Sequence, residues 1–193
     1  MSVTASSESV SPTRAMILRA AASAFASHGY RAATVQMIAR EAGFTPPTVY
    51  AHFGNKQGLL HALIEELRTD LFAVLGRPLP EGLSLRQSLE LRVRDLLELA
   101  ERQRDTFAVF LVRPYDLPDL GDGEEEQMML SMYWQALLEQ HQGELGDRTP
   151  LEASLIIEGI LFAWVKRWLA SKEPGIASET RRLVDLVLGG VTG

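Results

Sequence analysis

The 193-residue sequence contains no cysteine, and this absence excludes several classes of protein. Without thiols the chain cannot form disulfides, use a cysteine nucleophile, or hold zinc or an iron–sulfur cluster through thiolates. Its four histidines are far apart and form no His-x-x-x-His or Glu-x-x-His pair. The sequence also lacks a P-loop, a dinucleotide fingerprint and a G-x-S-x-G elbow. We therefore expect no catalytic residue, no metal site and no cofactor.

Long hydrophobic runs are missing as well. The longest apolar stretch, residues 155–165, is eleven residues long and is interrupted by Glu158, so it is too short to span a bilayer. Residues 1–11 are polar and have neither a basic start nor an apolar h-region, unlike a signal peptide. These absences predict a cytoplasmic protein that makes no membrane contact, with a disordered tail at 1–11.

Positive charge is in short supply. Nineteen Lys and Arg residues against 25 Asp and Glu residues give a net charge of −6. Taken over the whole chain, this acidity argues against a protein that binds nucleic acid.

Hydrophobic residues make up 46% of the chain, enough for a packed core, and in most segments they recur at the three- and four-residue spacing of amphipathic helices. No segment alternates as a strand does, so we expect an all-α fold of about nine helices. The expected helices cover residues 12–28, 35–42, 46–53, 56–75, 84–101, 103–113, 123–141, 150–170 and 178–190. Pro78, Pro80 and Gly82 mark the clearest boundary between domains.

The second and third expected helices are joined by the tight turn Ala42-Gly43-Phe44-Thr45. Three short helices with such a turn are typical of a helix-turn-helix, in which one helix braces the DNA backbone and the next enters the major groove. A glycine between helices is alone only a common helix cap. The three helices and the glycine-bearing turn together, rather than the glycine alone, indicate the helix-turn-helix.

Nine short fragments in this region fit one known pattern: Ala24-Phe25, Gly29-Tyr30, Ala33-Thr34-Val35, Ile38-Ala39, Glu41-Ala42-Gly43-Phe44-Thr45, Thr48-Val49-Tyr50, His52-Phe53, Asn55-Lys56 and Leu59-Leu60. As a run, they resemble the N-terminal domain of the TetR family of transcriptional regulators over residues 13 to 65. The resemblance implies a helix-turn-helix DNA-binding domain at 12–56, a connecting helix at 57–76, and an effector-binding and dimerisation domain at 77–193.

The charge divides along the same boundary. Residues 11–56 carry a net charge of +4, whereas residues 57–193 carry −9. A basic DNA-binding segment on an acidic body fits the resemblance, and the charge of the whole chain conceals it.

The resemblance places DNA contacts at the start of the second helix, along the third and at the start of the fourth. We expect Lys56 to clamp a phosphate, and specificity to rest on Gln36, Thr48 and Tyr50, on thymine methyl groups and on DNA shape. Thr34 and Thr45 are expected mainly to cap the starts of their helices. The alternative for Lys56 is an ordinary side chain exposed to solvent. The full set of expected DNA-binding residues is Thr34, Gln36, Thr45, Pro46, Pro47, Thr48, Tyr50, His52 and Lys56.

The helix at 150–170 is apolar around most of its circumference, so it needs a partner on two sides. Gly159 permits a close approach in mid-helix. With the last helix, it resembles the family's dimerising helix pair; the alternative is the central helix of a monomer. The expected interface is Ile156, Gly159, Ile160, Ala163, Trp164, Arg167, Leu183, Leu186 and Val187.

The middle helices are expected to enclose an effector, through the adaptable apolar side chains of methionines and aromatic residues. The alternative for each of these residues is that it packs in the hydrophobic core and does not contact a ligand. Arg113 would orient an anionic group or complement a helix end or an acidic patch. The expected contacts are Phe107, Phe110, Arg113, Met129, Met132 and Tyr133, and no ligand is named.

The sequence thus predicts a ligand-responsive repressor that binds a palindromic operator on double-stranded DNA as a homodimer, releases it when a small-molecule effector binds, and is not an enzyme. The helix at 56–75 joins the two domains and is the natural lever. The alternative is a TetR-like dimeric ligand-binding or interaction module without DNA function.

Overall fold

The computed structural model describes residues 11–112, 123–171, 173 and 175–192, with only the backbone of 112 and 123–127. Over these ranges it has nine α-helices, two short 3₁₀ helices and no strand, which confirms the expected all-α class. The α-helices are α1 (Pro12–His28), α2 (Val35–Ala42), α3 (Pro46–Phe53), α4 (Lys56–Leu75), α5 (Leu85–Arg102), α6 (Arg104–Val112), α7 (Gly123–Glu139), α8 (Pro150–Ala170) and α9 (Thr180–Val191). The predicted tail at 1–11, apart from Ser11, lies outside the described residues.

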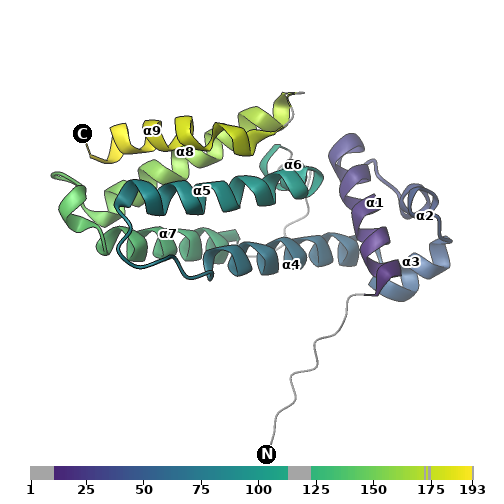
Figure 1. Ribbon diagram of the computed structural model, residues 1–193. Helices are drawn as coiled ribbons and strands as arrows, with labels where there is room; N and C mark the ends of the chain where they lie inside the picture. Colours follow the sequence, from purple (N-terminus) through teal and green to yellow (C-terminus); the bar gives the residue numbers. More distant parts are fainter. Residues whose placement is uncertain (1–10, 113–122, 172, 174, 193) are drawn as a thin grey trace, which may run out of the picture.

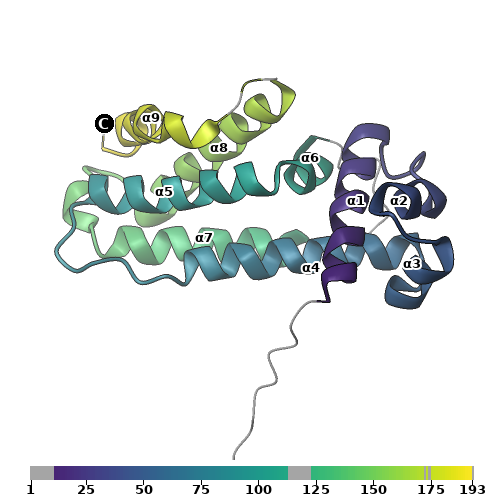
Figure 2. The same ribbon diagram turned by 45° about the vertical axis from the view of Figure 1, so that its right-hand side comes forward.

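The helices form two groups. Figure 1 shows α1, α2 and α3 together at one end of the molecule, with α4 running from them along the second group. In that group α5 packs against α4 and α9, while α8 packs against α6, α7 and α9. The turned view in Figure 2 keeps the same separation. The short helices at one end are therefore joined to the larger bundle mainly through α4 and α6.

Each group has its own hydrophobic core. The first core contains buried residues of α1, α2, α3 and the first half of α4, including Phe25, Ile38 and Val49. Alanines on α1 are small enough to let α2 pack closely against it. Val109 of α6 is 1% exposed and belongs to this same core, so the body reaches into the N-terminal group.

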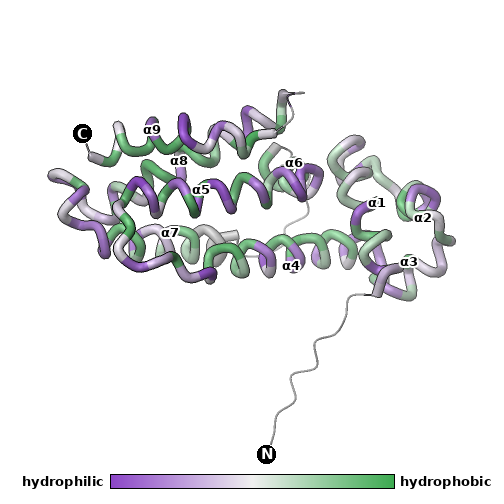
Figure 3. The backbone as a smooth tube through the Cα atoms, viewed as in Figure 1, coloured by the Kyte–Doolittle hydropathy of each residue, from purple (hydrophilic) through white to green (hydrophobic). Residues whose placement is uncertain are grey.

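The second core is built from α5, α7, α8 and α9 around Leu97, Trp134 and Ile157. Figure 3 shows hydrophobic residues on the side of α9 that faces α8 and hydrophilic residues on its other side. Capping boxes start α5 at Ser84 and α8 at Thr149, which satisfies backbone N–H groups at both helix starts. The separators that the sequence marks therefore coincide with real helix ends.

Within the described ranges, every helix is too short or too polar to cross a lipid bilayer.

Candidate functional site

The turn between α2 and α3 is held by local hydrogen bonds. Thr34 caps α2 by accepting a hydrogen bond from Met37 N at 3.2 Å. Gly43 ends α2 in the left-handed region, with φ of 77°, where a side chain would be strained. The N–H of Phe44 then donates to Ala39 O at 2.8 Å, which fixes the direction in which the chain enters α3. This is the glycine-bearing turn that the sequence predicts.

Helix α3 rests on the first core through Val49, which is 1% exposed, and through the partly buried Phe53. Its other side is open. Tyr50 is 44% exposed and His52 is exposed. Thr45 does not cap the backbone as expected, because its hydroxyl pairs with that of Thr48 at 3.0 Å. A helix that packs on the core along one side and is exposed along the other can be laid into a groove of DNA.

The expected DNA-binding residues lie together on this end of the molecule. Thr34, Gln36, Thr45, Pro47, Tyr50 and His52 are exposed, and Pro46, Thr48 and Lys56 are partly exposed. Their individual contacts with DNA remain predictions. The positions are compatible with them because none of the nine side chains is buried in the core.

Lys56 is more constrained than expected. Its ammonium donates to the backbone oxygens of Tyr30 at 2.9 Å, Arg31 at 3.2 Å and Ala33 at 3.0 Å. All three N–H donors of the ammonium are thereby used. Lys56 therefore joins the start of α4 to the loop between α1 and α2, a role that the sequence did not reveal. A hydrogen bond to phosphate would require one of these bonds to be exchanged.

The effector residues expected from the sequence do not all come together. Met129, Met132 and Tyr133 of α7 line one groove, of about 410 Å³. Phe107 instead packs against the second core and Phe110 against the first, because α6 lies between the two cores. Neither phenylalanine lines this groove, so their contact with an effector stays a prediction. Arg113 lies outside the described residues.

The other wall of the groove comes from the end of α4, which the sequence reasoning missed. Phe72, Leu75 and Gly76 face the α7 residues there. The available signal was the apolar cluster at residues 71–75, directly before the proline-bearing linker. A helix that stays apolar up to its last turn needs a partner at that end.

The exposed apolar residues of α8 lie on one face. Leu151 is 51%, Leu155 58% and Phe162 50% exposed, and Gly159 and Ala163 are exposed between and beside them. These positions recur at intervals of three and four, which puts them on one side of a helix. On α9, Leu186 is 48% exposed. We call these six residues the apolar face.

Two of the expected interface residues are wrong. Leu183 and Val187 of α9 are each 0% exposed, because they pack into the second core of their own chain. They lie three residues before and one residue after the exposed Leu186, which points out of the core. Ile156 packs inside the chain too, so closely that a Cβ on Gly190 would lie 2.9 Å from its Cγ2.

The remaining interface candidates sit at the edge of the apolar face. Trp164 is partly buried between two guanidinium groups, with Arg167 5.4 Å and Arg182 5.6 Å from its ring centroid. Ile160 is also partly buried. A Cβ on Gly159 would meet nothing within 4 Å, so its own chain does not require a glycine there.

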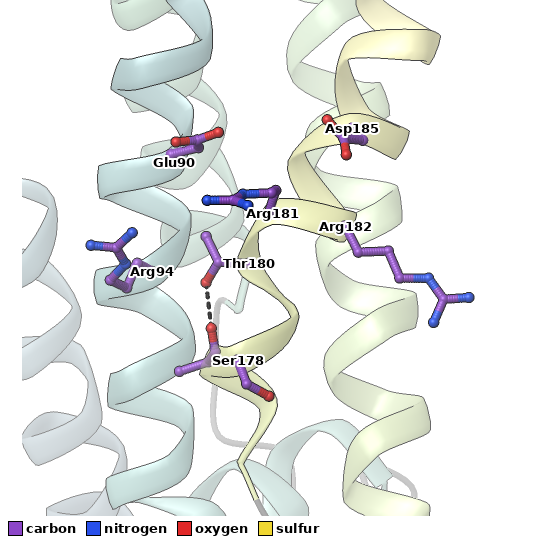
Figure 4. A pocket seen from close by; sticks show the side chains of 8 residues that line it. Glu90, Arg94, Ser178, Thr180, Arg181, Arg182 and Asp185 are labelled. Carbon is purple, nitrogen blue, oxygen red and sulfur yellow. Dashed lines mark hydrogen bonds between the residues drawn. The ribbon is translucent and has the colours of Figure 1, made fainter.

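A second cavity, of about 490 Å³, lies between α5 and α9 and has a charged lining (Figure 4). Figure 4 shows Arg181 pointing from α9 toward α5, whereas Arg182 points away from the cavity. The two carboxylates of the lining are both engaged by Arg86, at 2.6 Å from Asp185 and 3.6 Å from Glu90. Among the described residues, none of the expected effector contacts lines it.

Comparisons with known proteins agree with this geometry. The family of bacterial regulatory proteins called tetR matches residues 17–63. The uncharacterized HTH-type transcriptional regulator YdgC of Bacillus subtilis (strain 168) is 33% identical over 187 residues, covering 93% of this chain and 92% of YdgC. The HTH-type transcriptional repressor KstR2 of Rhodococcus jostii (strain RHA1) is 31% identical over 97 residues, covering 50% of this chain and 48% of KstR2.

Among solved structures, a TetR-like transcriptional regulator from Rhodococcus sp. RHA1 matches with a TM-score of 0.76 at 21% identity, covering 94% of this chain and 96% of that one. At this identity the likeness supports the fold. The match to YdgC extends over nearly all of both chains, and the family match covers the helix-turn-helix. The chain therefore belongs to the TetR family and is a DNA-binding transcriptional regulator.

Proposed function

We propose that this regulator is a ligand-responsive repressor that acts as a homodimer on a palindromic operator. Residues 12–56 read DNA, 57–76 connect, and 77–193 bind the effector and dimerise. The proposal rests mainly on the exposed α2–α3 end together with the charge of its segment: residues 11–56 carry a net charge of +4, whereas residues 57–193 carry −9. Such a charge division favours docking through one end only, because the acidic body is repelled by phosphate.

The proposed DNA contacts are the nine residues expected from the sequence. Tyr50 and His52 offer a hydroxyl and an imidazole from the open face of α3, while Thr34 and Gln36 lie at the start of α2. The N-terminus of a helix adds backbone N–H groups that favour phosphate. Few side chains on α3 have several donors, so base recognition there rests on Thr48, Tyr50, methyl contacts and DNA shape.

The apolar face of α8 and α9 supports the homodimer. Four large side chains that are about half exposed on adjoining helices are unusual for a surface facing water. Gly159 lies in the middle of this face, where the absence of a side chain lets a second backbone approach. A twofold dimer places two α3 helices in successive major grooves, which matches a palindromic site.

The groove between α4 and α7 is the proposed effector site. Its volume is within the ordinary range for small-molecule sites, and Met129 and Met132 supply adaptable apolar walls. Its position suits regulation, because α4 leads from the groove to the DNA-binding end. In this mechanism, the effector binds more tightly to a dimer whose two α3 helices are wrongly spaced for DNA. The resulting loss of operator affinity is limited by the difference between the effector's binding free energies for the two states of the dimer.

The direct test uses the full-length protein. Operator duplexes are selected from random DNA, and binding is measured by mobility shift at several salt concentrations, with the oligomeric state measured by analytical ultracentrifugation. We expect the selected DNA to contain an inverted repeat and to bind one dimer of the protein. The logarithm of the binding constant should fall linearly with the logarithm of the salt concentration. Recovery of a site without twofold symmetry, or binding by a monomer, would refute the proposed mode.

A further inference from the structure

Arg92 of α5 is 1% exposed, although it carries a full positive charge. Its guanidinium donates from Nε to the Tyr133 hydroxyl, from Nη1 to Val74 O, and from Nη2 to Arg77 O at 2.5 Å. A buried charge is tolerated only when its donors are satisfied in this way. Arg92 therefore joins three elements at one point: the end of α4, the segment after it, and α7.

This point lies at the wall of the α4–α7 groove. Tyr133 and Leu75 line the groove, and Val74 is the neighbour of Leu75 in the same helix turn. The Tyr133 oxygen accepts from Arg92, so its own O–H proton is left to donate elsewhere. Burial raises the pKa of Tyr133, more than Arg92 lowers it, and the phenol keeps this proton at neutral pH.

The groove thus has a largely apolar lining that includes Tyr133, whose hydroxyl keeps one proton to donate. Phe72, Leu75, Met129 and Met132 offer no polar partner to a ligand. We infer that the groove takes an amphiphile whose apolar body packs on these side chains and whose terminal oxygen accepts a hydrogen bond from Tyr133. Arg92 is the positioning residue that orients the hydroxyl. This inference rests on the proposed effector function of the groove.

An acceptor is favoured over a donor by the local charge. Arg92 and Arg77 each lie 3.7 Å from the same carboxylate oxygen of Asp95, so two guanidiniums share one acid. The net positive charge favours a carbonyl, carboxylate or sulfonate oxygen at the polar end of the ligand. A ligand N–H at this position would meet a hydroxyl whose oxygen is already occupied by Arg92.

The same guanidinium gives the ligand a route to the lever helix. A ligand bonded to Tyr133 changes the polarity of the hydroxyl to which Arg92 donates. Arg92 also holds the backbone oxygen of Val74, in the last turn of α4. The first residue of α4 is Lys56, at the DNA-binding end. Three hydrogen bonds in series, from the ligand to Tyr133, from Arg92 to Tyr133 and from Arg92 to Val74, therefore link the polar end of the ligand to the helix that joins the domains.

Three fluorescent probes with related naphthalene bodies test the chemistry of the groove. 1-Anilinonaphthalene-8-sulfonate carries an anionic oxygen, N-phenyl-1-naphthylamine is the same body without the sulfonate, and prodan carries a neutral ketone. Affinities are measured for the full-length protein, for Tyr133→Phe, and for Met132→Glu. Met132 is 60% exposed, so a charge there blocks the groove without disturbing the core.

We expect Met132→Glu to weaken all three probes. Tyr133→Phe is expected to weaken the sulfonate probe about 10-fold and to change N-phenyl-1-naphthylamine less than ~2-fold, since only the former loses a hydrogen bond. A parallel loss for prodan assigns the site to any acceptor oxygen, and no loss for prodan assigns it to anionic oxygens. Equal effects of Tyr133→Phe on the sulfonate probe and on its unsulfonated partner would overturn the inference.

The positioning role of Arg92 has its own readout. Arg92→Met is expected to weaken the sulfonate probe as much as Tyr133→Phe does, and the double variant no further, because both changes remove one oriented donor. Arg92→Lys is expected to restore part of the selectivity. A purely structural Arg92 would instead weaken all three probes alike, and the effects of the two substitutions would add. If Arg92→Met does not fold, Arg92→Lys with Tyr133→Phe gives the same comparison.

The outcomes separate the two proposals. If Met132→Glu leaves the binding of every probe unchanged, the groove is not a ligand site, and the proposed effector function fails with the inference. If Met132→Glu removes binding but Tyr133→Phe does not discriminate between the probes, the groove stands and only the acceptor chemistry fails.

Discussion

The ammonium of Lys56 lies 4.5 Å from the ring centroid of Tyr30 and donates to the backbone oxygen of the same residue at 2.9 Å. Two further bonds to Arg31 O and Ala33 O complete its set of donors. The residue after Ala33 is Thr34, the N-cap of α2. One side chain at the start of the lever helix therefore fixes the segment from which the helix-turn-helix begins.

Replacing Lys56 with Met removes three hydrogen bonds from a charged donor. We expect the free energy of unfolding to fall by about 2 kcal/mol, a drop in Tm of roughly 4–8 °C. Operator affinity is expected to fall as well, because the start of α2 loses its fixed position. Differential scanning fluorimetry and fluorescence anisotropy measure the two effects. Arg31→Met, which removes one charge from an exposed side chain of the same loop, is the control and should leave Tm unchanged.

Tyr50→Ala tests the open face of α3. Tyr50 is 44% exposed, so its removal should hardly change Tm, while the loss of its contact with DNA should lower operator affinity about 10-fold. Met128→Ala on α7, where the side chain is 57% exposed, is the matched control. Unchanged operator affinity in Tyr50→Ala at physiological salt would remove this residue from the interface.

Phe162→Glu tests the apolar face. A carboxylate placed in an apolar contact with a second chain should raise the dimer dissociation constant by about 100-fold and weaken operator binding. Sedimentation velocity measures the oligomeric state, and circular dichroism confirms that helix content is kept. Met128→Glu is the control, because Met128 is about as exposed as Phe162 but lies outside the apolar face; it should leave the dimer intact. A dimeric Phe162→Glu protein would show that the interface lies elsewhere.

Glu158 predicts a dependence of stability on pH. Desolvation raises its pKa above the ordinary value of 4.5, against a smaller lowering by Ser131, and its Oε1 has no hydrogen-bond partner among the described residues. The folded state therefore binds a proton more readily than the unfolded chain, and this contribution to stability rises as pH falls from above the raised pKa toward 4.5.

Glu158→Gln should consequently stabilise the protein at pH 7, by less than ~1 kcal/mol or under ~2–4 °C in Tm, because solvent screens a carboxyl that is only partly buried. The gain should shrink as the pH falls from the raised pKa toward 4.5 and should be absent below 4.5, where the carboxyl of the parent protein is protonated in both states. Thermal unfolding over this pH range measures it. Glu98→Gln, on the exposed side of α5, is the control. A gain that persists unchanged at low pH would point to packing rather than charge.

Most helix bounds could be predicted from the sequence because they follow from local chemistry. The Ser84 and Thr149 caps, the glycine at position 43 and the prolines between helices act within a few residues. The expected ends agree with the structure within about two residues for almost every helix. The helix-turn-helix was predictable for the same reason, because its turn and its exposed face are consecutive in the chain.

The sites in the body depend on which helices meet, and spacing alone does not decide that. Leu183 and Leu186 have the same chemistry, and only the packing of α9 on α5 and α8 buries the first and exposes the second. Phe110 was placed in the effector site, but α6 turns it toward the N-terminal core. The burial of Arg92 depends on partners 15 to 41 positions away, beyond the reach of any local pattern.

Val109, buried in the core of α1 to α4, limits how freely this protein can be recombined. A chimera that joined this helix-turn-helix to the body of another regulator would lose the packing of α6 on α1 and leave that part of the α1 surface uncovered. Exchange of α2 and α3 alone leaves the contact between α1 and α6 in place. Exchange of the whole N-terminal group requires α6 to be exchanged with it, so the two should be inherited, and engineered, as one unit.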